Sequence, residues 1–285
     1  MTVRTLLLPA AVAAALAAAP ATAAADTLLH PTPAGTQNLT ANGGYLAWAE
    51  PNQPAGSGWR IVVREPSGAV VTPPIPVFED PPVMTIGSDR AAAGRNLLLT
   101  YSRAGDVYTY DLRQGGAERR VRRVSTAADE RLPTVSYGTF HFVRASGSRP
   151  GIYQWSPRSG LRRIARDLPR ELASNGTRVA YPKGNRIVVR RASGRGTPFV
   201  LRTTGRPRSL LLSRYRVSWL VGDEAFKSGR FGGSGSEVPA NASERGARLI
   251  PGAVSIAFGR GDRVTLALDA EGVKQLVPTP FGSTG

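Results

Sequence analysis

A short strand pattern that recurs along the chain constrains the fold more than any other feature of the sequence. Each copy begins with a polar turn, continues with alternating apolar residues and often ends on an aromatic residue. The copies occupy residues 42–48, 95–101, 137–143, 175–181, 213–219 and 260–266, and the last two are the weakest. Their ends lie 38 to 53 positions apart, with a mean spacing near 44. This spacing is typical of repeat units that each hold four short strands.

The residues between the copies supply candidates for the other strands of each unit. Runs of β-branched and aromatic residues follow four of the copies, at 59–64, 106–110, 151–155 and 186–190. Arg-rich runs come next, at 119–124, 161–165 and 198–202. No segment shows a convincing 3.6-residue helical period, and 32 glycines and 23 prolines favour many turns. The sequence therefore predicts an all-β fold, a six-bladed β-propeller of four-stranded antiparallel blades.

The repeat also sets the expected domain boundaries. Residues 26–285 should form a single propeller, with blades at 36–78, 79–124, 125–165, 166–202, 203–250 and 251–285. The last unit is one strand short. Residues 26–30 contain a spare apolar stretch, so we expect them to complete that unit and close the ring. Residues 222–246 are rich in glycine and lack a clear strand, which predicts an insertion on one face.

The first 25 residues have the pattern of a secretory signal peptide. Arg4 provides a positive start, residues 6–19 are apolar, and three alanines at 23–25 provide a small-residue cleavage site. The alternative is a retained membrane anchor, but the apolar run is short for a span. The chain has no cysteine, which excludes a lipobox, disulfides and thiolate metal sites. We therefore expect cleavage before Asp26 and a secreted or periplasmic protein with no later transmembrane segment.

Residues 132–165 resemble a blade of the TolB-like and WD40-like six-bladed β-propellers. The matching residues are Pro133, Ser136, Gly138, Phe142, Val143, Ile152, Tyr153, Gly160 and the closing run 161–164. Residues 106–124 resemble the second half of such a blade. The inner turn departs from the family's Ser-Pro-Asp-Gly, since it reads Ser136-Tyr137-Gly138 here. The resemblance implies an exported propeller that serves as an interaction platform in the envelope, and it implies no particular activity.

Motifs for common enzyme chemistry are absent from the sequence. It contains no G-x-S-x-G elbow, no phosphate-binding glycine loop and only two histidines, His30 and His141. Asp129 and Glu130 precede a predicted inner strand, which would place them near a channel mouth. His141 should face the opposite way from Phe140 and Phe142 on its strand. Asp129, Glu130 and His141 are therefore channel-mouth candidates. Solvated turn acids and a structural histidine are the alternatives, and we predict no catalytic residue, metal or cofactor.

Positive charge is the strongest functional signal. Lys and Arg total 37 against 20 Asp and Glu, a formal net charge of +17, and all but three of the basic residues are arginine. Arginines cluster on predicted outer strands of neighbouring blades, at Arg119, Arg120, Arg122, Arg123, Arg158, Arg162, Arg163, Arg190 and Arg191. Such a rim would attract polyanions. The alternatives are solvated outer strands protected from edge pairing, or a coding bias toward arginine.

These observations favour an exported, non-enzymatic interaction module that binds a protein or an envelope ligand as a monomer. An anionic polymer or a membrane surface is also compatible with the rim, whereas nucleic acid is not expected outside the cell. Two other functions stay open: a propeller hydrolase or lyase that acts on carbohydrate or peptide, and a non-specific polyanion binder.

Overall fold

A computed structural model describes residues 26–53, 56–89, 96–213, 216–221, 225–230, 245–249, 253–259 and 264–276. The predicted signal peptide, residues 1–25, lies outside these ranges. Within them, no helix is long and apolar enough to cross a membrane.

The described residues form six four-stranded antiparallel sheets. The first three are β2 (Gln37–Asn42), β3 (Tyr45–Pro51), β4 (Trp59–Arg64), β5 (Val70–Val71); β6 (Met84–Ser88), β7 (Leu97–Arg103), β8 (Asp106–Asp111), β9 (Arg119–Arg120); and β10 (Glu130–Ser136), β11 (Thr139–Arg144), β12 (Gly151–Ser156), β13 (Gly160–Ala165). The others are β14 (Ala173–Ser174), β15 (Arg178–Pro182), β16 (Arg186–Arg191), β17 (Phe199–Arg202); β18 (Pro207–Leu212), β19 (Arg216–Val221), β20 (Ala225–Arg230), β21 (Arg245–Leu249); and β22 (Ser255–Gly259), β23 (Val264–Leu268), β24 (Gly272–Leu276) with β1 (Thr27–Pro31).

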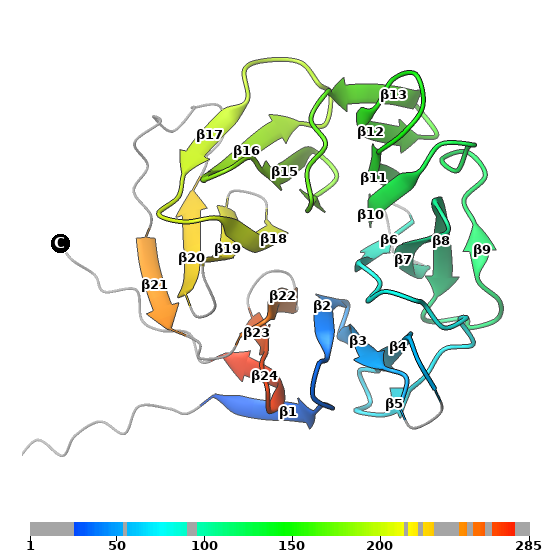
Figure 1. Cartoon of the computed structure of the whole chain (residues 1–285), viewed down its shortest axis with the longest axis vertical. Helices are drawn as coiled ribbons and strands as arrows, with labels where there is room; N and C mark the ends of the chain where they lie inside the picture. Colours follow the sequence, from blue (N-terminus) through cyan, green and yellow to red (C-terminus); the bar gives the residue numbers. More distant parts are fainter. Residues whose placement is uncertain are drawn as a thin grey trace, which may run out of the picture.

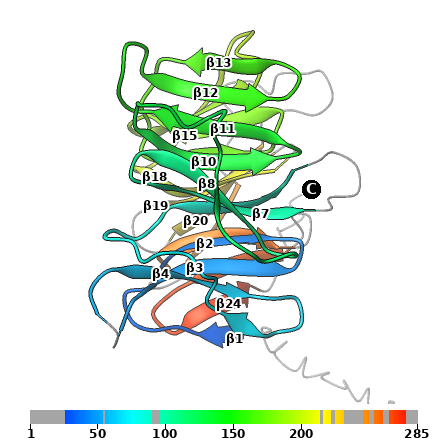
Figure 2. The ribbon, with the colours of Figure 1, turned by 90° about the vertical axis from the view of Figure 1, so that its right-hand side faces the viewer.

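The sheets are arranged around a common centre, with the first strand of each nearest to it (Figure 1). The inner strands contact one another in the order β2, β6, β10, β14, β18, β22 and back to β2. Figure 2 shows the sheets from the side of the ring. The prediction of an all-β propeller with four-stranded antiparallel blades is confirmed. In the last sheet, β1 pairs antiparallel with β24, so an N-terminal strand completes a sheet built from the C-terminal residues.

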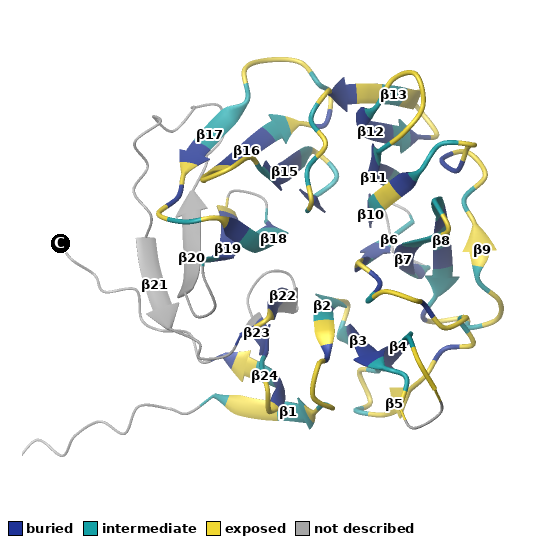
Figure 3. Cartoon of the chain, in the orientation of Figure 1, coloured by how far each residue is buried: buried dark blue, intermediate teal, exposed yellow. Residues whose placement is uncertain are grey.

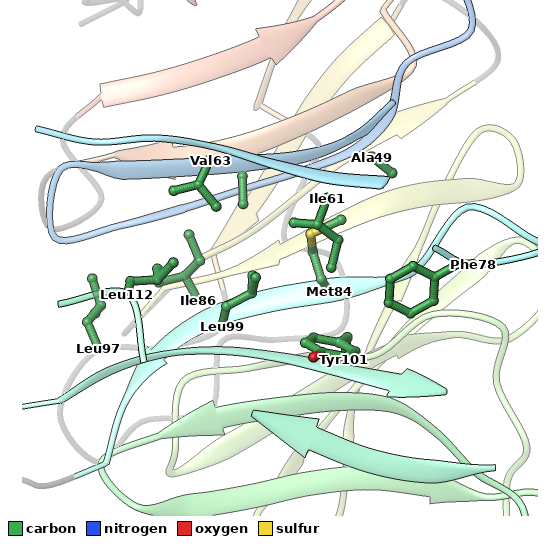
Figure 4. Packing of buried hydrophobic residues seen from close by; sticks show 11 residues of the cluster. Ala49, Ile61, Val63, Phe78, Met84, Ile86, Leu97, Leu99, Tyr101 and Leu112 are labelled. Atoms are coloured by element: carbon green, nitrogen blue, oxygen red, sulfur yellow. The ribbon is translucent and has the colours of Figure 1, made fainter. Parts of the chain in front are cut away.

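The hydrophobic core lies between neighbouring sheets. Between the β2–β5 and β6–β9 sheets, Ile61 and Val63 face Met84, Ile86 and Leu99 (Figure 4). Middle strands such as β3 and β11 are covered on both faces, as the continuous burial of residues 46–50 and 140–143 shows. Side chains on alternate faces of one strand therefore pack against different neighbouring sheets, which explains why the repeats read as nearly unbroken apolar runs.

Two details of the strand prediction were wrong. The run 119–124 was expected to be a strand, but only Arg119–Arg120 pairs with β8. The chain then turns, and the Val124 and Ser125 amides both donate to the Val121 carbonyl, at 2.9 Å each. In the stretch 222–246, where no strand was expected, residues 225–230 form β20 and pair with β19; the part of the predicted insertion at 231–244 lies outside the described residues. The β-branched content of β20 is low, so its pairing with β19 decides its structure.

The inner strands of every second sheet, β2, β10 and β18, each contain a register shift against the strand they pair with: β3, β11 and β19. Each break contains a non-glycine residue at positive φ: Asn38, Leu132 or Ser209. A side chain bonds a backbone group at each break. From strands of the preceding sheet, Ser255 Oγ accepts from the Leu39 amide (3.1 Å) and Thr85 Oγ1 donates to the Pro133 carbonyl (3.1 Å). From the segment just before β14, Glu171 Oε2 accepts from the Leu210 amide (3.2 Å). Bulges free backbone groups, and these bonds satisfy them.

Candidate binding rim and channel-mouth residues

His141 lies in the middle of β11, and none of its surface is exposed. Its Nδ1 lies 2.8 Å from Ser174 Oγ of the next sheet. Burial first, and then the charge of Arg162, lower the pKa of His141 to about 3, so the imidazole is neutral. The register places it in one cross-strand row with Thr134, Gln154 and Arg162. The structure thus places His141 between two sheets, with Nδ1 bonded to Ser174 and Nε2 buried without a partner in the described residues.

The other two channel-mouth candidates lie at the start of β10, where an inner strand was expected. Glu130 is fully buried and accepts hydrogen bonds from Arg144 Nε at 2.9 Å and Thr126 Oγ1 at 2.7 Å. Asp129 is half-buried and forms an ion pair with Arg131. Both carboxylates are therefore already engaged by neighbouring side chains.

The rim arginines fall into two groups. Five side chains are exposed and make no hydrogen bond or ion pair within the described part of the chain: Arg119, Arg122, Arg123, Arg158 and Arg191. The other four have partners: Arg120 pairs with Asp106 at 2.8 Å, Arg162 donates to Gln154, Arg163 donates to the Pro150 carbonyl at 3.3 Å, and Arg190 donates to the Ile164 carbonyl at 2.9 Å.

The strands that hold these arginines differ in position. Arg119 and Arg120 lie on β9, and Arg162 and Arg163 on β13, which are the outermost strands of their sheets (Figure 3). Arg190 and Arg191 lie on β16, one strand further in. The predicted rim residues thus lie on the outer strands β9 and β13 of two successive sheets and one strand further in at the sheet that follows.

A surface pocket between β13 and β16 is the feature that the sequence pattern missed. It has a volume of about 430 Å³ and is lined by Arg163, Ile164, Ala165, Arg166, Asp167 and Arg190. The sequence reasoning singled out Arg163 and Arg190 on separate strands, but strand patterns carry no signal that the two side chains would line one pocket. That juxtaposition depends on how the two sheets stack.

Asp167 is the one acid among the lining residues, and other groups hold its two carboxylate oxygens. Lys183 Nζ lies 2.8 Å from Oδ1, and the Tyr181 hydroxyl donates to Oδ2 at 2.9 Å. Partial burial opposes ionisation, but these hydrogen bonds and the charges of Lys183 and Arg190 outweigh it and lower the pKa of Asp167. Burial, and next the hydrogen bond to Asp167, raise the pKa of Tyr181. Asp167 is therefore ionised and neutralised mainly by Lys183.

Other acids that the sequence reasoning did not single out lie in similar pairs. Glu50 is almost fully buried, accepts from Trp48 Nε1 at 2.7 Å and pairs with Arg60 at 3.2 Å. Glu118 binds the Tyr101 hydroxyl and Arg103. No group of three or more His, Asp or Glu residues suited to a metal ion occurs in the ranges that the structure describes.

No protein-family model matches the sequence, and no curated protein matches it. Solved structures do share the fold. A gluconolactonase from Xanthomonas campestris has a TM-score of 0.59 at 14% identity and covers 87% of each chain. A candidate gluconolactonase has a TM-score of 0.60 at 11% identity, covering 88% of this chain and 90% of the other. A chain of a nidogen–laminin complex has a TM-score of 0.56 at 15% identity, covering 75% and 80%.

A TolB from Acinetobacter baumannii also resembles the chain, but its TM-score of 0.49 carries no argument about kinship. Identities this low show a shared fold and leave activity open, because one fold hosts many functions. The chain is therefore similar to β-propellers of several kinds, and TolB-like membership stays a prediction.

Proposed function

We propose that this chain is an exported, six-bladed β-propeller that acts as a non-enzymatic binding module and engages an anionic partner through its arginine rim. One observation carries the proposal. Five rim arginines are exposed with no side-chain partner in the described part, whereas Glu130 and His141 are buried in internal hydrogen bonds. Among the predicted site residues, the exposed rim arginines are thus available to a ligand, whereas the channel-mouth candidates Glu130 and His141 are not.

The chemistry of arginine supports an anionic partner. A guanidinium presents five N–H donors in a planar fork that fits carboxylate or phosphate oxygens in pairs. Charges gathered on one surface also raise the rate at which an oppositely charged partner arrives, and this effect weakens with salt. In a secreted or periplasmic setting, the compatible partners are acidic proteins, anionic wall polymers and lipid head groups. The similarity to a chain of a nidogen–laminin complex adds that this fold occurs in protein assemblies.

The test is affinity capture from native envelope extract, at about 50 and about 300 mM salt, a range over which purely electrostatic contacts weaken strongly. Three baits are compared: the wild-type protein, the rim variant Arg119→Ser/Arg122→Ser/Arg123→Ser, and the control Arg170→Ser/Arg186→Ser/Arg206→Ser. All six arginines are exposed, and the two variants lose the same charge. We expect one partner to be retained at both salts by the wild-type and control baits and to be lost by the rim variant.

Equal loss from both variants would mean that overall charge, not the rim, binds the partner, and the chain would then be a non-specific polyanion binder. Capture of the partner by all three baits would show that Arg119, Arg122 and Arg123 are not needed for binding, which would overturn the rim proposal.

A lactone hydrolase is the second candidate, because two similar structures are a gluconolactonase and a candidate gluconolactonase that match most of the chain. The direct assay measures hydrolysis of gluconolactone by the purified protein against the spontaneous rate. Turnover that rises in proportion to protein concentration would favour the enzyme. Hydrolysis at the spontaneous rate, with the fold intact by circular dichroism, would reject the lactone hydrolase and keep the binding module as the proposed function.

A further inference from the structure

We infer that the pocket between β13 and β16 is a binding site for a tetrahedral oxyanion, a phosphate or sulfate group carried by the partner. This inference rests on the proposed function and names the part of the rim that recognises the anion. Three arginines, Arg163, Arg166 and Arg190, are among the six residues that line the pocket. These residues come from β13, from the segment after it and from β16 of the next sheet.

Two of the three guanidinium groups are held in place by backbone carbonyls. Arg163 Nη1 donates to the Pro150 carbonyl at 3.3 Å, and Arg190 Nη1 donates to the Ile164 carbonyl at 2.9 Å. Each contact occupies one donor direction, so most of the five N–H groups of each arginine stay available. Both residues also lie on paired strands, so little ordering is needed when an anion binds. Arg166 is exposed and makes no hydrogen bond or ion pair within the described residues.

The charges around the pocket are not balanced from within. Asp167 is ionised, but its two oxygens are bound by Lys183 and Tyr181, and Lys183 offsets its charge. The four cations Arg163, Arg166, Arg190 and Lys183 face one anion, Asp167, so three positive charges remain in excess at this surface. An uncompensated cluster of this kind is unfavourable without a counter-ion, because like charges repel at short range. The structure thus presents a site that an anion would stabilise.

The number and form of the donors favour a tetrahedral oxyanion over a single carboxylate. Three guanidinium forks can address three or four oxygens at once, which phosphate and sulfate present and one carboxylate does not. The pocket volume of about 430 Å³ lies in the ordinary range for small ligands, so the group carrying the anion can partly enter. Ile164 and Ala165, both buried in the core between the sheets, complete the lining.

The first experiment is a calorimetric titration of the purified protein with inorganic phosphate and with sulfate at low salt. The test variant is Arg166→Ser, and the control is Arg158→Ser. Both arginines are exposed and unpaired in the described part, and both changes remove one charge, but only Arg166 lines the pocket. We expect saturable binding at one site, about tenfold weaker in Arg166→Ser and within about twofold of wild type in Arg158→Ser, since tenfold is the effect of one charge-assisted hydrogen bond.

A second variant, Arg190→Lys, keeps the charge and removes the planar fork. We expect it to weaken phosphate binding by more than Arg158→Ser does. Two sources of the anion are then compared, glycerol phosphate in solution and vesicles of phosphatidylglycerol, with phosphatidylcholine vesicles as the reference. Binding to glycerol phosphate alone indicates a phosphate group carried in solution, and added binding to phosphatidylglycerol vesicles indicates a lipid head group.

Equal weakening by Arg166→Ser and Arg158→Ser, or no saturable binding to either anion, would overturn the pocket assignment. The capture experiment separates this failure from failure of the proposed function. If the partner is still captured through the rim while phosphate and sulfate do not bind, the pocket inference falls and the binding module stands. If neither phosphate binding nor rim-dependent capture occurs, both fall.

Discussion

At the scale of single residues, the molecule buries several polar side chains and gives most of them a partner. Neither His141 nor Glu130 exposes any surface; Glu130 is bonded by Thr126 and Arg144, whereas His141 is bonded at Nδ1 and its Nε2 has no partner in the described residues. The imidazole is kept neutral, whereas the carboxylate has the Arg144 guanidinium beside it. The free energy of unfolding therefore depends on the protonation state of these groups and on the residues that bond them, because a buried polar group without a partner is destabilising.

The buried imidazole predicts a loss of stability on mild acidification. The pKa of His141 is about 3 in the folded state, against an ordinary value of 6.5, so the unfolded chain binds the additional proton between these values. The contribution is complete above pH 6.5, and it falls by about 1.4 kcal/mol per pH unit below that. Urea unfolding at pH 7, 6 and 5 measures this slope. In His141→Gln the slope should flatten, and in the control His30→Gln it should persist; a steep slope in His141→Gln contradicts the assignment.

The ion pair of Glu130 with Arg144 predicts a large loss of stability when the carboxylate is removed. In Glu130→Ala the Arg144 guanidinium, whose side chain is 14% exposed, is left in the interior without its partner. The free energy of unfolding should fall by about 3–5 kcal/mol. In the control Asp129→Asn, which breaks the more exposed pair with Arg131, it should fall by less than about 1 kcal/mol. Urea midpoints test both, and a similar loss in the two variants would refute a structural role specific to Glu130.

At the scale of elements, pairing between segments far apart in sequence completes the ring. β1 and β24 are joined over residues 27–31 and 272–275, and Gly272 lies opposite Pro31. Gly272 has a φ of +138°, and a Cβ built there would lie 2.1 Å from the His30 carbonyl oxygen. The backbones of β1 and β24 therefore approach too closely at this point for any side chain.

Gly272→Ala should therefore detach β1 from the sheet. The methyl group cannot fit against the His30 carbonyl, so the outer strand must move, and we expect limited proteolysis to cleave near β1 much faster than in wild type. Gly56→Ala is the matched control: Gly56 has a φ of +146°, and no atom lies within 4 Å of its would-be Cβ. It carries the backbone strain without the clash. Equal cleavage at β1 in the two variants would show that strain alone, and not contact with His30, explains the effect.

At the scale of the whole molecule, stacked sheets separate apolar and charged groups. Middle strands such as β3 and β11 pack on both faces, while outer strands such as β9 and β13 carry arginine to the surface (Figure 3). A chain with a net charge of +17 repels itself least when its cations are at the periphery and far apart. The ring thus displays its charge outward, and the rim variants above measure whether that charge selects a partner.

The sequence by itself determined the strand repeat. Its period, its apolar runs and the turns at residues such as Gly138 are local properties, so the four-stranded units and inner strands such as β10 and β18 could be predicted. Residues 225–230 could not, because their strand depends on pairing with β19 rather than on β-branched content.

The tertiary structure alone decided the accessibility of the candidate site residues. The alternation of side chains along a strand shows which residues share a face. In stacked sheets both faces of a strand can be covered by other sheets, so the alternation does not show which side chains are exposed to solvent. The sequence therefore predicted that His141 lies on the face opposite Phe140. It did not predict that His141 contacts Ser174 of the next sheet. Likewise, Arg163 and Arg190 were foreseen as cations, but only the stacking of two sheets brings them to one pocket.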